Sequence, residues 1–453
     1  MSGCVQKKWL VRAVNNPVAE GAPMNRRLKA IAILIAAIVS LTTLARVGAV
    51  QEATRGIIPQ PHLGLVNANV LDIRTGNIRA NTTVVIRNGK IVSVGNDSVP
   101  TGADIMNLDG RYLVPGFMDG HVHYRDIESA RRAVQSGVTT NKSANAGGYR
   151  DVSIRNMVKQ GYLEGPDMLA AGVFVSPTPS FESILADSRL YRFMTERADT
   201  PENIALMVRV NLEHGVDWIK TRSSERAGGP ATDPRELVYT EDQLRVMVEE
   251  ASTKNVPIQS HVQGDVGAAP AIKAGVRMIE HGWYLSEESL ELMQRHGTYW
   301  DPTTPALMDV AEPHNDYDNV VAELRAPYMI SNVKRNLRRA RELGVKVVTG
   351  TDTRYGPNSV SRIWWEINNL VVWGGFTPLE ALQAATIVSA EAYKLDGITG
   401  AIEPNLEADL IAFDRNPLED ILIITEPVLV ISNGRIALNR QLIPTKPGRV
   451  PGN

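Results

Sequence analysis

Residues 112–123 read YLVPGFMDGHVH, an apolar run of strand length that passes through a glycine-containing turn into two histidines. Side chains on an extended strand alternate between its two faces, so His121 and His123 should point the same way. At the end of a strand, such a pair is a ready site for a metal ion that favours nitrogen ligands. A bare His-x-His also has a simpler interpretation, two polar residues at a strand end, and four further positions decide between the two.

Four other apolar runs of strand length also end in an ionisable or metal-competent residue. They are Gly215–Lys220, Val256–His261, Gly275–His281 and Gly344–Asp352. Helix-like segments lie between them, for example residues 240–254. Strands that alternate with helices indicate βαβ units and a parallel sheet, and a (β/α)8 barrel collects polar residues from its strand ends around the active site. The sequence therefore predicts an α/β barrel that gathers all five strand ends at one site.

These motifs resemble those of the amidohydrolase superfamily, on its binuclear branch. The chain is similar in particular to the imidazolonepropionase-related group, which includes prolidase-like carboxypeptidases and ochratoxin-degrading amidases. The similarity runs from about Leu65 to about Leu438. Further family motifs are Gly137–Thr140, Thr377–Ala381, Ala384–Thr386 and Glu407–Leu410.

The resemblance implies two divalent metal ions, with zinc as the default. The six implied ligands are, in chain order, His121, His123, Lys220, His261, His281 and Asp352. The first two would hold the more buried ion, and the aspartate would be both a ligand and the catalytic base. The lysine would be N-carboxylated and bridge both ions, and the other two histidines would hold the second ion. The implied reaction is attack by a hydroxide that bridges the ions, with the aspartate carrying its proton to the leaving amine.

The chain departs from the family pattern in two places. The family usually reads close to Val-Arg-Asp after Thr140, whereas residues 141–148 read NKSANAGG. We expect this segment to follow the second barrel strand and to border the pocket, so that it affects substrate preference rather than metal binding. Asn405 replaces a turn glycine of the family. Asparagine tolerates the left-handed backbone conformation that such a turn requires, so we expect the turn to be kept.

The composition is that of a globular enzyme. The 453 residues are 43% hydrophobic and carry a formal net charge of −2, which argues against a nucleic-acid-binding protein with its basic excess. Cys4 is the only cysteine of the sequence. Neither a disulfide framework nor a thiolate metal site is therefore available, and nitrogen and oxygen ligands must hold any metal.

Residues 1–49 have the layout of a secretory signal region. A basic start at Met24–Lys29 precedes the apolar run Ala30–Val39, and Val47–Ala49 offers a small-residue cleavage site. Met24 is a candidate for the true start. We therefore expect export to the periplasm or the medium, with no stable membrane span after cleavage. The alternative is an uncleaved membrane anchor.

Two β-rich flanks surround the α/β centre. Asn88-Gly89 separates two β runs, which is a strong hairpin signal, and Asn433-Gly434 repeats the pattern near the other end. We expect the two flanks to join in one discontinuous β-sandwich beside the hydrolase barrel. The expected boundaries are 50–115 and 399–445 for the sandwich, 116–398 for the barrel and 446–453 for a tail.

Candidate substrate-binding residues follow from a carboxylate on the substrate, which favours a planar bidentate partner. Arg222, Arg226 and Arg354 lie on predicted loops at the catalytic face. A solvated loop charge is an equally good interpretation for each of them. Tyr239 precedes a helix start and would be a hydrogen-bond donor if it reached the pocket. Glu280 should face away from the neighbouring histidine and have a packing or salt-bridge role.

The sequence favours hydrolysis of an amide or peptide bond in a small molecule, such as an N-acyl amino acid or an Xaa-Pro-type dipeptide. Three alternatives are open: the same metal pair acting on a carbamate, ester, lactone or phosphotriester; a mononuclear deaminase or imidazolone hydrolase; and a non-catalytic binding scaffold. Deaminases of the superfamily typically lack the strand-four lysine and place a glutamate after the strand-five histidine, whereas Lys220 is present and Val262-Gln263-Gly264 follows His261. A homo-oligomer is compatible with the sequence.

Overall fold

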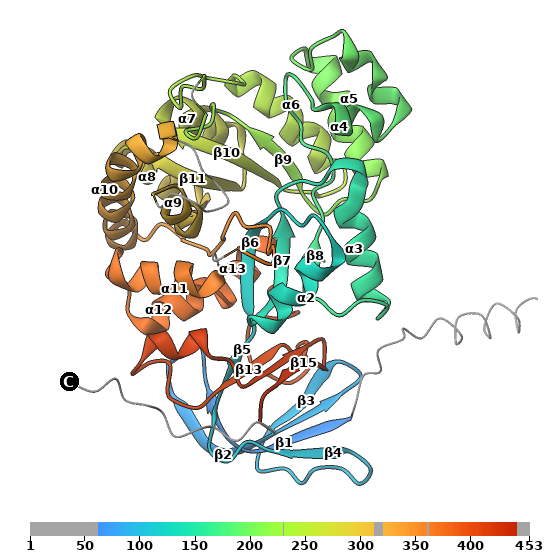
Figure 1. Ribbon diagram of the computed structural model, residues 1–453, viewed down its shortest axis with the longest axis vertical. Coiled ribbons are helices and arrows are strands. Elements are labelled where there is room, and N and C mark those ends of the chain that lie inside the picture. Colours follow the sequence, from blue (N-terminus) through green and yellow to red (C-terminus); the bar gives the residue numbers. More distant parts are fainter. Residues whose placement is uncertain (1–61, 230, 312–319, 360–361, 442–453) are drawn as a thin grey trace, which may run out of the picture. The chain divides into compact units, whose positions relative to one another are not determined.

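The computed structural model describes residues 62–229, 231–311, 320–359 and 362–441. These residues belong to one unit, Gly56–Asn453, whose elements are labelled in Figure 1. The expected signal region 1–49 and tail 446–453 lie outside the described residues. No helix in the described part is both long and apolar enough to cross a membrane.

Strands from both flanks of the chain form one mixed sheet. It has the order β15-β14-β13-β5-β1-β2-β3, and β4 pairs with the first half of β1. The strands are β1 (Leu63–Leu71), β2 (Ile78–Arg87), β3 (Lys90–Gly95), β4 (Asp104–Asn107), β5 (Tyr112–Pro115), β13 (Leu410–Phe413), β14 (Leu429–Ser432) and β15 (Arg435–Asn439). β5 and β13 run antiparallel with Val114 opposite Ile411, so the two flanks share hydrogen bonds. The strands expected to form a sandwich thus belong to one hydrogen-bonded sheet with its own buried apolar core.

Asn-Gly turns close two hairpins of this sheet, at the positions that the sequence predicted. Asn88 and Gly89 have φ of 53° and 77° and connect β2 to β3. Asn433 and Gly434 have φ of 52° and 71° and connect β14 to β15. Positive φ at both central residues is what a two-residue type I′ turn requires. Asn405 has φ of 74°, so its expected left-handed conformation is confirmed.

The centre of the chain alternates parallel strands with helices. Its strands form two parallel sheets, β6-β7-β8 and β9-β10-β11-β12 (Figure 1). The strands are β6 (Phe117–Val122), β7 (Val138–Ser143), β8 (Asp167–Leu169), β9 (Ile219–Arg222), β10 (Ile258–Gly264), β11 (Met278–Tyr284) and β12 (Tyr299–Asp301). Nearly all of their residues are buried, as expected for parallel strands covered by helices on the outside.

Isolated parallel bridges join these two sheets to each other. The bridges are Val175–Thr221, Trp300–Val347 and Val122–Thr353. The first links the segment after β8 to β9. The other two link residues 347–353 to β12 on one side and to β6 on the other.

The strand predicted over residues 344–352 is present only as these isolated bridges. Asp352 has φ of 54°, a left-handed conformation that does not continue a strand. The backbone N–H of Thr351 donates to the Asp119 side chain at 3.0 Å rather than to a neighbouring strand. Backbone hydrogen bonds to β6 continue on either side, from the Gly120 N–H to the Thr349 carbonyl at 2.7 Å and from the Asp352 N–H to the His121 carbonyl at 2.8 Å, so a side-chain hydrogen bond interrupts the pairing only at Thr351.

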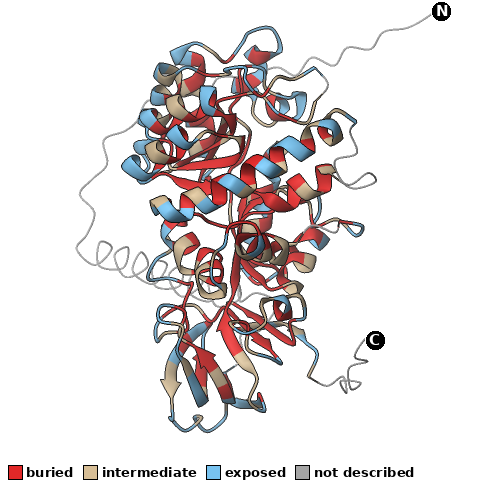
Figure 2. Cartoon of the chain, turned by 90° about the vertical axis from the view of Figure 1, so that its left-hand side faces the viewer, coloured by how far each residue is buried: buried red, intermediate tan, exposed pale blue. Residues whose placement is uncertain are grey.

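Helices cover the parallel strands. They are α2 (Ile127–Gln135), α3 (Arg150–Lys159), α4 (Phe181–Leu185), α5 (Pro201–Glu213), α6 (Glu241–Ser252), α7 (Asp265–Ala274), α8 (Glu287–His296), α9 (Thr304–Ala311), α10 (Val320–Leu343), α11 (Ile363–Val372), α12 (Pro378–Ala384) and α13 (Ile387–Tyr393), with short 3₁₀ turns at Gly147–Tyr149, Ser188–Met194 and Ile421–Thr425. Figure 2 shows helices that are buried on one face and exposed on the other. In α6, for example, Leu244 and Met247 are buried and Arg245 is exposed, which is the apolar spacing of a helix packed on a core.

Candidate metal centre

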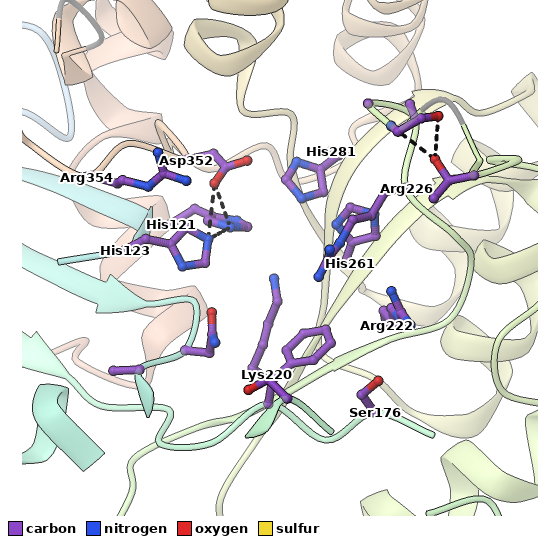
Figure 3. A pocket seen from close by; sticks show the side chains of 18 of the residues that line it. His121, His123, Ser176, Lys220, Arg222, Arg226, His261, His281, Asp352 and Arg354 are labelled. Atoms are coloured by element: carbon purple, nitrogen blue, oxygen red, sulfur yellow. Dashed lines mark hydrogen bonds and ion pairs between the residues drawn. The ribbon is translucent and has the colours of Figure 1, made fainter. Parts of the chain in front are cut away.

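One cavity of about 910 Å³ contains all six predicted ligands in its wall. It lies at the carboxyl ends of the parallel strands, where a barrel enzyme has its active site. The six side chains are His121, His123, Lys220, His261, His281 and Asp352, and Figure 3 shows them facing a common space. Residues far apart in the sequence therefore converge as predicted.

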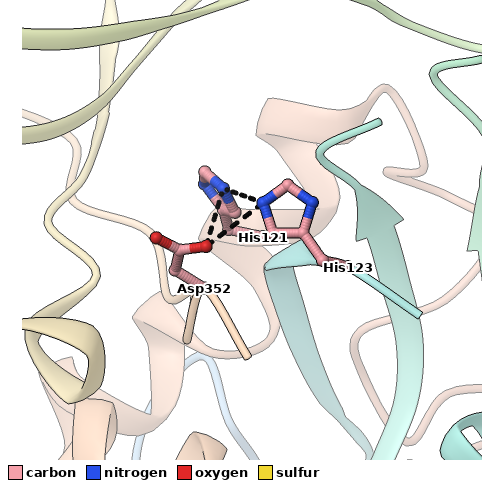
Figure 4. Close-up of side chains that lie close together, drawn as sticks. All are labelled: His121, His123 and Asp352. Carbon is pink, nitrogen blue, oxygen red and sulfur yellow. Dashed lines mark hydrogen bonds and ion pairs between the residues drawn. The ribbon is translucent and has the colours of Figure 1, made fainter. Parts of the chain in front are cut away.

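His121 of β6 and His123, which directly follows this strand, point the same way. His121 Nε2 lies 3.2 Å from His123 Nε2. Asp352 Oδ1 lies 3.4 Å from the first of these nitrogens and 3.2 Å from the second (Figure 4). His121 is buried, whereas His123 and Asp352 are partly accessible from the cavity. Three ligand atoms that face one point at these separations match the requirement of a metal ion.

Asp119 fixes the loop that carries Asp352. Its Oδ1 accepts hydrogen bonds from the backbone N–H groups of Thr351 at 3.0 Å and His121 at 3.2 Å. Its Oδ2 accepts from the hydroxyls of Thr351 at 2.6 Å and Tyr355 at 2.8 Å. Burial raises the pKa of Asp119 to about 6, and the hydrogen bonds from Thr351 and Tyr355 oppose this rise. The strand end and the loop are thus held together by one carboxyl group.

Lys220, His261 and His281 complete the cavity wall opposite these residues. The ring centroid of His281 lies 4.9 Å from that of His121 and 4.4 Å from that of His261. His281 Nδ1 is 2.8 Å from the Thr303 hydroxyl, which leaves Nε2 for another partner. His261 Nε2 is buried without a hydrogen-bond partner among the described residues. Buried polar atoms are rarely left unpartnered, so a nitrogen in this state fits a metal ligand.

The charge state of the buried histidines also fits a metal site. Burial lowers the pKa values of His121, His261 and His281 well below the ordinary range. These imidazoles are therefore neutral at pH 7, which is the form that binds metal ions. Imidazole and carboxylate ligands together suit zinc.

Glu280 lies among the ligands, which corrects the expectation that it faces away from His281. His281 has φ of 69°, and this left-handed conformation breaks the alternation of β11, so that the side chains of Glu280 and His281 both face inward. Glu280 is fully buried and contacts Lys220 Nζ. Its Oε1 lies 3.3 Å from Lys142 Nζ and 3.3 Å from His121 Nδ1, the latter without hydrogen-bond geometry. The salt-bridge role expected for Glu280 is confirmed.

Lys142 of β7 is a second buried lysine, and the sequence did not single it out. Its side chain is fully buried, and burial lowers its pKa to about 7, while Asp301 and Asp119 act in the opposite direction. Burial and the nearby Lys142 charge also lower the pKa of Lys220. The carboxylate of Glu280, which contacts Lys220 Nζ, has the opposite effect and favours the charged form of Lys220. Two lysines thus share one buried carboxylate beneath the cavity.

Asp301 at the end of β12 extends this buried network. Both of its carboxylate oxygens lack a hydrogen-bond partner among the described residues, and burial raises its pKa well above the ordinary range. With His121 and Glu280 it forms a second group of potential ligand atoms within 4.8 Å of one another. Because two lysine side chains lie against Glu280, we interpret this group as a charge network rather than as a further cation site.

The predicted substrate-binding arginines lie on the cavity wall, and Tyr239 does not. Arg222 forms an ion pair with Glu225 at 3.1 Å. Arg226 and Arg354 line the cavity, and their guanidinium groups have no hydrogen bond or ion pair within the described part of the chain. Tyr239 is buried, and its hydroxyl donates to a backbone carbonyl at 2.8 Å, so it is not available to a molecule in the cavity.

The segment at residues 141–148 is divided between a strand and the cavity wall. β7 continues to Ser143, so the first three residues belong to the strand rather than follow it. Asn145, Ala146 and Gly147 line the cavity, as expected for a segment that borders the pocket.

Residues 112–437 match the family model described as Amidohydrolase family. The chain belongs to the amidohydrolase family. The resemblance that the motifs indicated is thereby confirmed, and the match spans both the parallel strands of the site and the strands that follow them.

Relatives of this amidohydrolase include an ochratoxinase from Aspergillus niger. It is 26% identical over 410 residues, which cover 81% of this chain and 84% of the relative. A crystal structure of a Xaa-Pro dipeptidase with bound methionine is also similar, with a TM-score of 0.71, 25% identity, and coverage of 83% of this chain and 99% of that chain. A prolidase complexed with N-methylphosphonate-L-proline has a TM-score of 0.72 and 25% identity, over 83% of this chain and 98% of that chain.

The family and these relatives identify the protein as a hydrolase that acts on carbon–nitrogen bonds. Amidohydrolases generally bind metal ions, and the described residues offer a matching group in His121, His123 and Asp352. The structural relatives imply a TIM barrel with an additional domain, which agrees with the α/β centre and the separate mixed sheet.

Proposed function

We propose that the protein hydrolyses an amide or peptide bond of a small, carboxylate-bearing molecule at a pair of divalent metal ions. The observation that carries the proposal is the convergence of six potential ligands, from separate strand ends, on one cavity. N-acyl amino acids and Xaa-Pro-type dipeptides are the proposed substrates. The similarity to an Xaa-Pro dipeptidase supports this choice.

We assign the ligands to two ions, with zinc as the proposed metal. One ion would be held by His121, His123 and Asp352, and the other by the histidines of β10 and β11. Lys220 would bridge them after N-carboxylation, in which its neutral amine adds to carbon dioxide and releases one proton. When bound, the ions supply a water molecule of lowered pKa and a Lewis acid for the substrate carbonyl.

The side chains of this chain then position the substrate and move the proton. Asp352 lies at the cavity wall beside the imidazoles of His121 and His123, where its carboxylate can take the proton of the attacking water and pass it to the leaving amine. Arg222, Arg226 and Arg354 offer bidentate donors for a substrate carboxylate. Gln263 Oε1 is buried in the cavity wall without a partner within the described residues, so it can accept the amide N–H of an N-acyl amino acid.

We also infer that the parallel strands close into a (β/α)8 barrel. The bridges at Val175–Thr221, Trp300–Val347 and Val122–Thr353 support closure, with residues 347–353 in the place of the eighth strand. The inferred barrel spans residues 116–398, and the flanks 50–115 and 399–445 form the second domain.

We propose that the protein is exported and that residues 1–49 are removed. The basic start, the apolar run and the small-residue site support this proposal. N-terminal sequencing of periplasmic or secreted protein should then give Val50 or Gln51 as the first residue. Retention of Met1 or Met24 in cytoplasmic protein would show the proposal to be wrong.

An activity screen of the zinc-loaded mature protein tests the proposed reaction. N-acyl amino acids and Xaa-Pro dipeptides are compared with carbamates, esters and lactones, and product release is measured at one zinc concentration. We expect the amides to be cleaved with the highest kcat/KM and the chelator-treated protein to be inactive. Turnover of a carbamate, ester or lactone without turnover of any amide would replace the proposed substrate class by that one.

A further inference from the structure

We propose that the cavity binds substrates with a carboxylate on each side of the scissile amide bond, one at Arg354 and the other at Arg226. This inference rests on the proposed amide hydrolysis and specifies its substrate class. It stands on the balance of charges in the cavity wall and on the positions of these two side chains.

Positive charge dominates the cavity wall. The arginines that line it are Arg125, Arg150, Arg222, Arg226 and Arg354. Apart from the proposed ligand Asp352, the only acidic residue among the described lining residues is Glu182, which pairs with one of them, Arg150, at 2.7 Å. Arg222 is paired with Glu225. The guanidinium groups of the other three have no hydrogen bond or ion pair in the described part of the chain.

Arg354 and Arg226 lie on opposite sides of the proposed metal centre (Figure 3). Arg354 follows Asp352 by two residues and is partly buried on that side of the cavity. Arg226 lies beyond the end of β9, on the side of His261, and Lys220 lies between the two (Figure 3). A linear amide whose carbonyl sits at the centre therefore extends one half toward each arginine.

The segment that carries Arg226 is held by contacts from α10. Arg325 Nη1 donates to the Ala227 carbonyl at 2.7 Å, and Nη2 donates to the Thr232 carbonyl at 3.1 Å. An antiparallel bridge between Ser224 and Leu237 closes the base of the same segment. Arg226 is thus presented from an anchored loop, even though its own side chain is exposed.

Two separate anions explain the unpaired guanidinium groups of Arg354 and Arg226 better than one anion does. A guanidinium group near cationic metal ions is electrostatically unfavourable unless an anion lies between or beside them. Arginine binds a carboxylate through two parallel hydrogen bonds, which adds both affinity and orientation. Because the proposed centre lies between Arg354 and Arg226, one carboxylate cannot pair with both. An amide formed from a dicarboxylic acid and an amino acid meets both requirements.

A matched set of four amides tests the proposal on the zinc-loaded protein. The set is N-succinylphenylalanine, N-acetylphenylalanine, N-succinylphenylalaninamide and N-acetylphenylalaninamide, and release of the α-amine is measured. We expect kcat/KM to rise roughly tenfold for each carboxylate, as charge-assisted hydrogen bonds of this kind allow. Arg354→Met should abolish the effect of one carboxylate and Arg226→Met the effect of the other. The proposal would be overturned if the wild-type protein had equal kcat/KM for the four amides. It would also be overturned if either variant lost kcat/KM by the same factor for all four amides.

Arg235→Met is the matched control, because Arg235 lies on the same loop, is exposed, pairs with Asp233 and does not line the cavity. It should keep the wild-type ranking. If the protein cleaves none of the four amides, the proposed amide hydrolysis fails, and calorimetric Kd values of the same compounds decide the two-carboxylate proposal. Affinity that rises with each carboxylate supports it, and affinity that is independent of the carboxylates overturns it.

Discussion

The Asp119 carboxylate accepts a 2.6 Å hydrogen bond from the Thr351 hydroxyl, which ties the end of β6 to the loop of Asp352. The same carboxylate accepts from the backbone of His121 and Thr351 and from the Tyr355 hydroxyl. Two proposed ligands from distant parts of the sequence are therefore placed by one buried group. The distances at the metal centre depend on this carboxylate as much as on the ligands themselves.

Replacement of this carboxylate should weaken both the fold and the site. Asp119→Asn exchanges one acceptor oxygen for an amide NH2, which cannot accept from the hydroxyls of Thr351 and Tyr355. We expect a loss of about 1–3 kcal/mol in the free energy of unfolding, measured with urea, together with weaker zinc binding. Tyr355→Phe removes a single one of these bonds and should cost about 1 kcal/mol. Wild-type stability in both variants would contradict the assigned role.

Glu280→Gln tests the network beneath the cavity. Glutamine keeps the shape of the side chain but removes the negative charge that lies against Lys220 and Lys142. We expect zinc affinity to fall by about 10–100-fold, the usual cost of changing a group that orients metal ligands. Competition with a chromogenic chelator measures this affinity. Glu366→Gln is the control, since Glu366 is equally buried but contacts Thr304 instead of a proposed ligand, and it should bind zinc normally.

Lys220→Ala should lower the occupancy of the second ion and abolish most activity while the protein stays folded. The expected cause is loss of the bridge between the two ions. Bicarbonate or a short-chain carboxylic acid should restore part of the activity by supplying the missing oxygens. Metal analysis and kinetics on the same preparation check this. Two metal ions per chain with near-normal turnover would refute the binuclear assignment.

Asp352→Asn should reduce turnover more than it reduces metal binding. Asparagine keeps an oxygen at the position that faces His121 and His123, so the site can still assemble. It cannot take up the proton of the attacking water. General acid–base groups typically contribute about 10²–10⁴-fold, and we expect a loss of at least this size in kcat. Full metal content with kcat within a few-fold of wild type would remove Asp352 from the chemistry.

Glu366 should make the fold less stable as the pH rises. Burial raises its pKa from 4.5 to about 8, so the folded chain holds this proton more tightly than the unfolded chain does. The stability that this group contributes is fully present below pH 4.5, its pKa in the unfolded chain. It is lost as the pH rises through about 8, its pKa in the folded chain. Urea unfolding of metal-free protein between about pH 5 and pH 8 should show this decline. Glu366→Gln should lessen the decline but leave the part due to Asp409, whose pKa is raised to about 7. An unchanged pH dependence in the variant would show that Glu366 does not cause it.

The convergence of the ligands could be predicted because strand ends are marked in the sequence. Apolar runs that stop at His261, His281 or Lys220 are local patterns, and parallel strands place their ends at one edge. The Asn-Gly turn at 88–89 was predictable for the same reason, since its backbone requirement is local.

The remaining features depend on conformations that the sequence does not mark. The alternation of side chains along a strand predicted that Glu280 faces away from His281. This prediction was wrong because the backbone of His281 has a left-handed conformation. Lys142 lies in a strand whose residues were expected to form a loop, so its burial could not be anticipated. At Thr351 the backbone N–H bonds to the side chain of Asp119, a residue more than two hundred positions away in the sequence.

Because β5 pairs with β13, one of the contacts that support the metal centre comes from a strand that is synthesised late. β5 continues through Gly116 into β6, whose end carries His121. Its second partner, β13, begins at Leu410, so a chain emerging from the ribosome can pair β5 with β1 but lacks the hydrogen bonds between β5 and β13 until nearly all of the chain has been synthesised. Such a long-range contact forms late and slowly. A polypeptide that stopped before Leu410 would contain every proposed ligand and still lack the strand that supports the first of them.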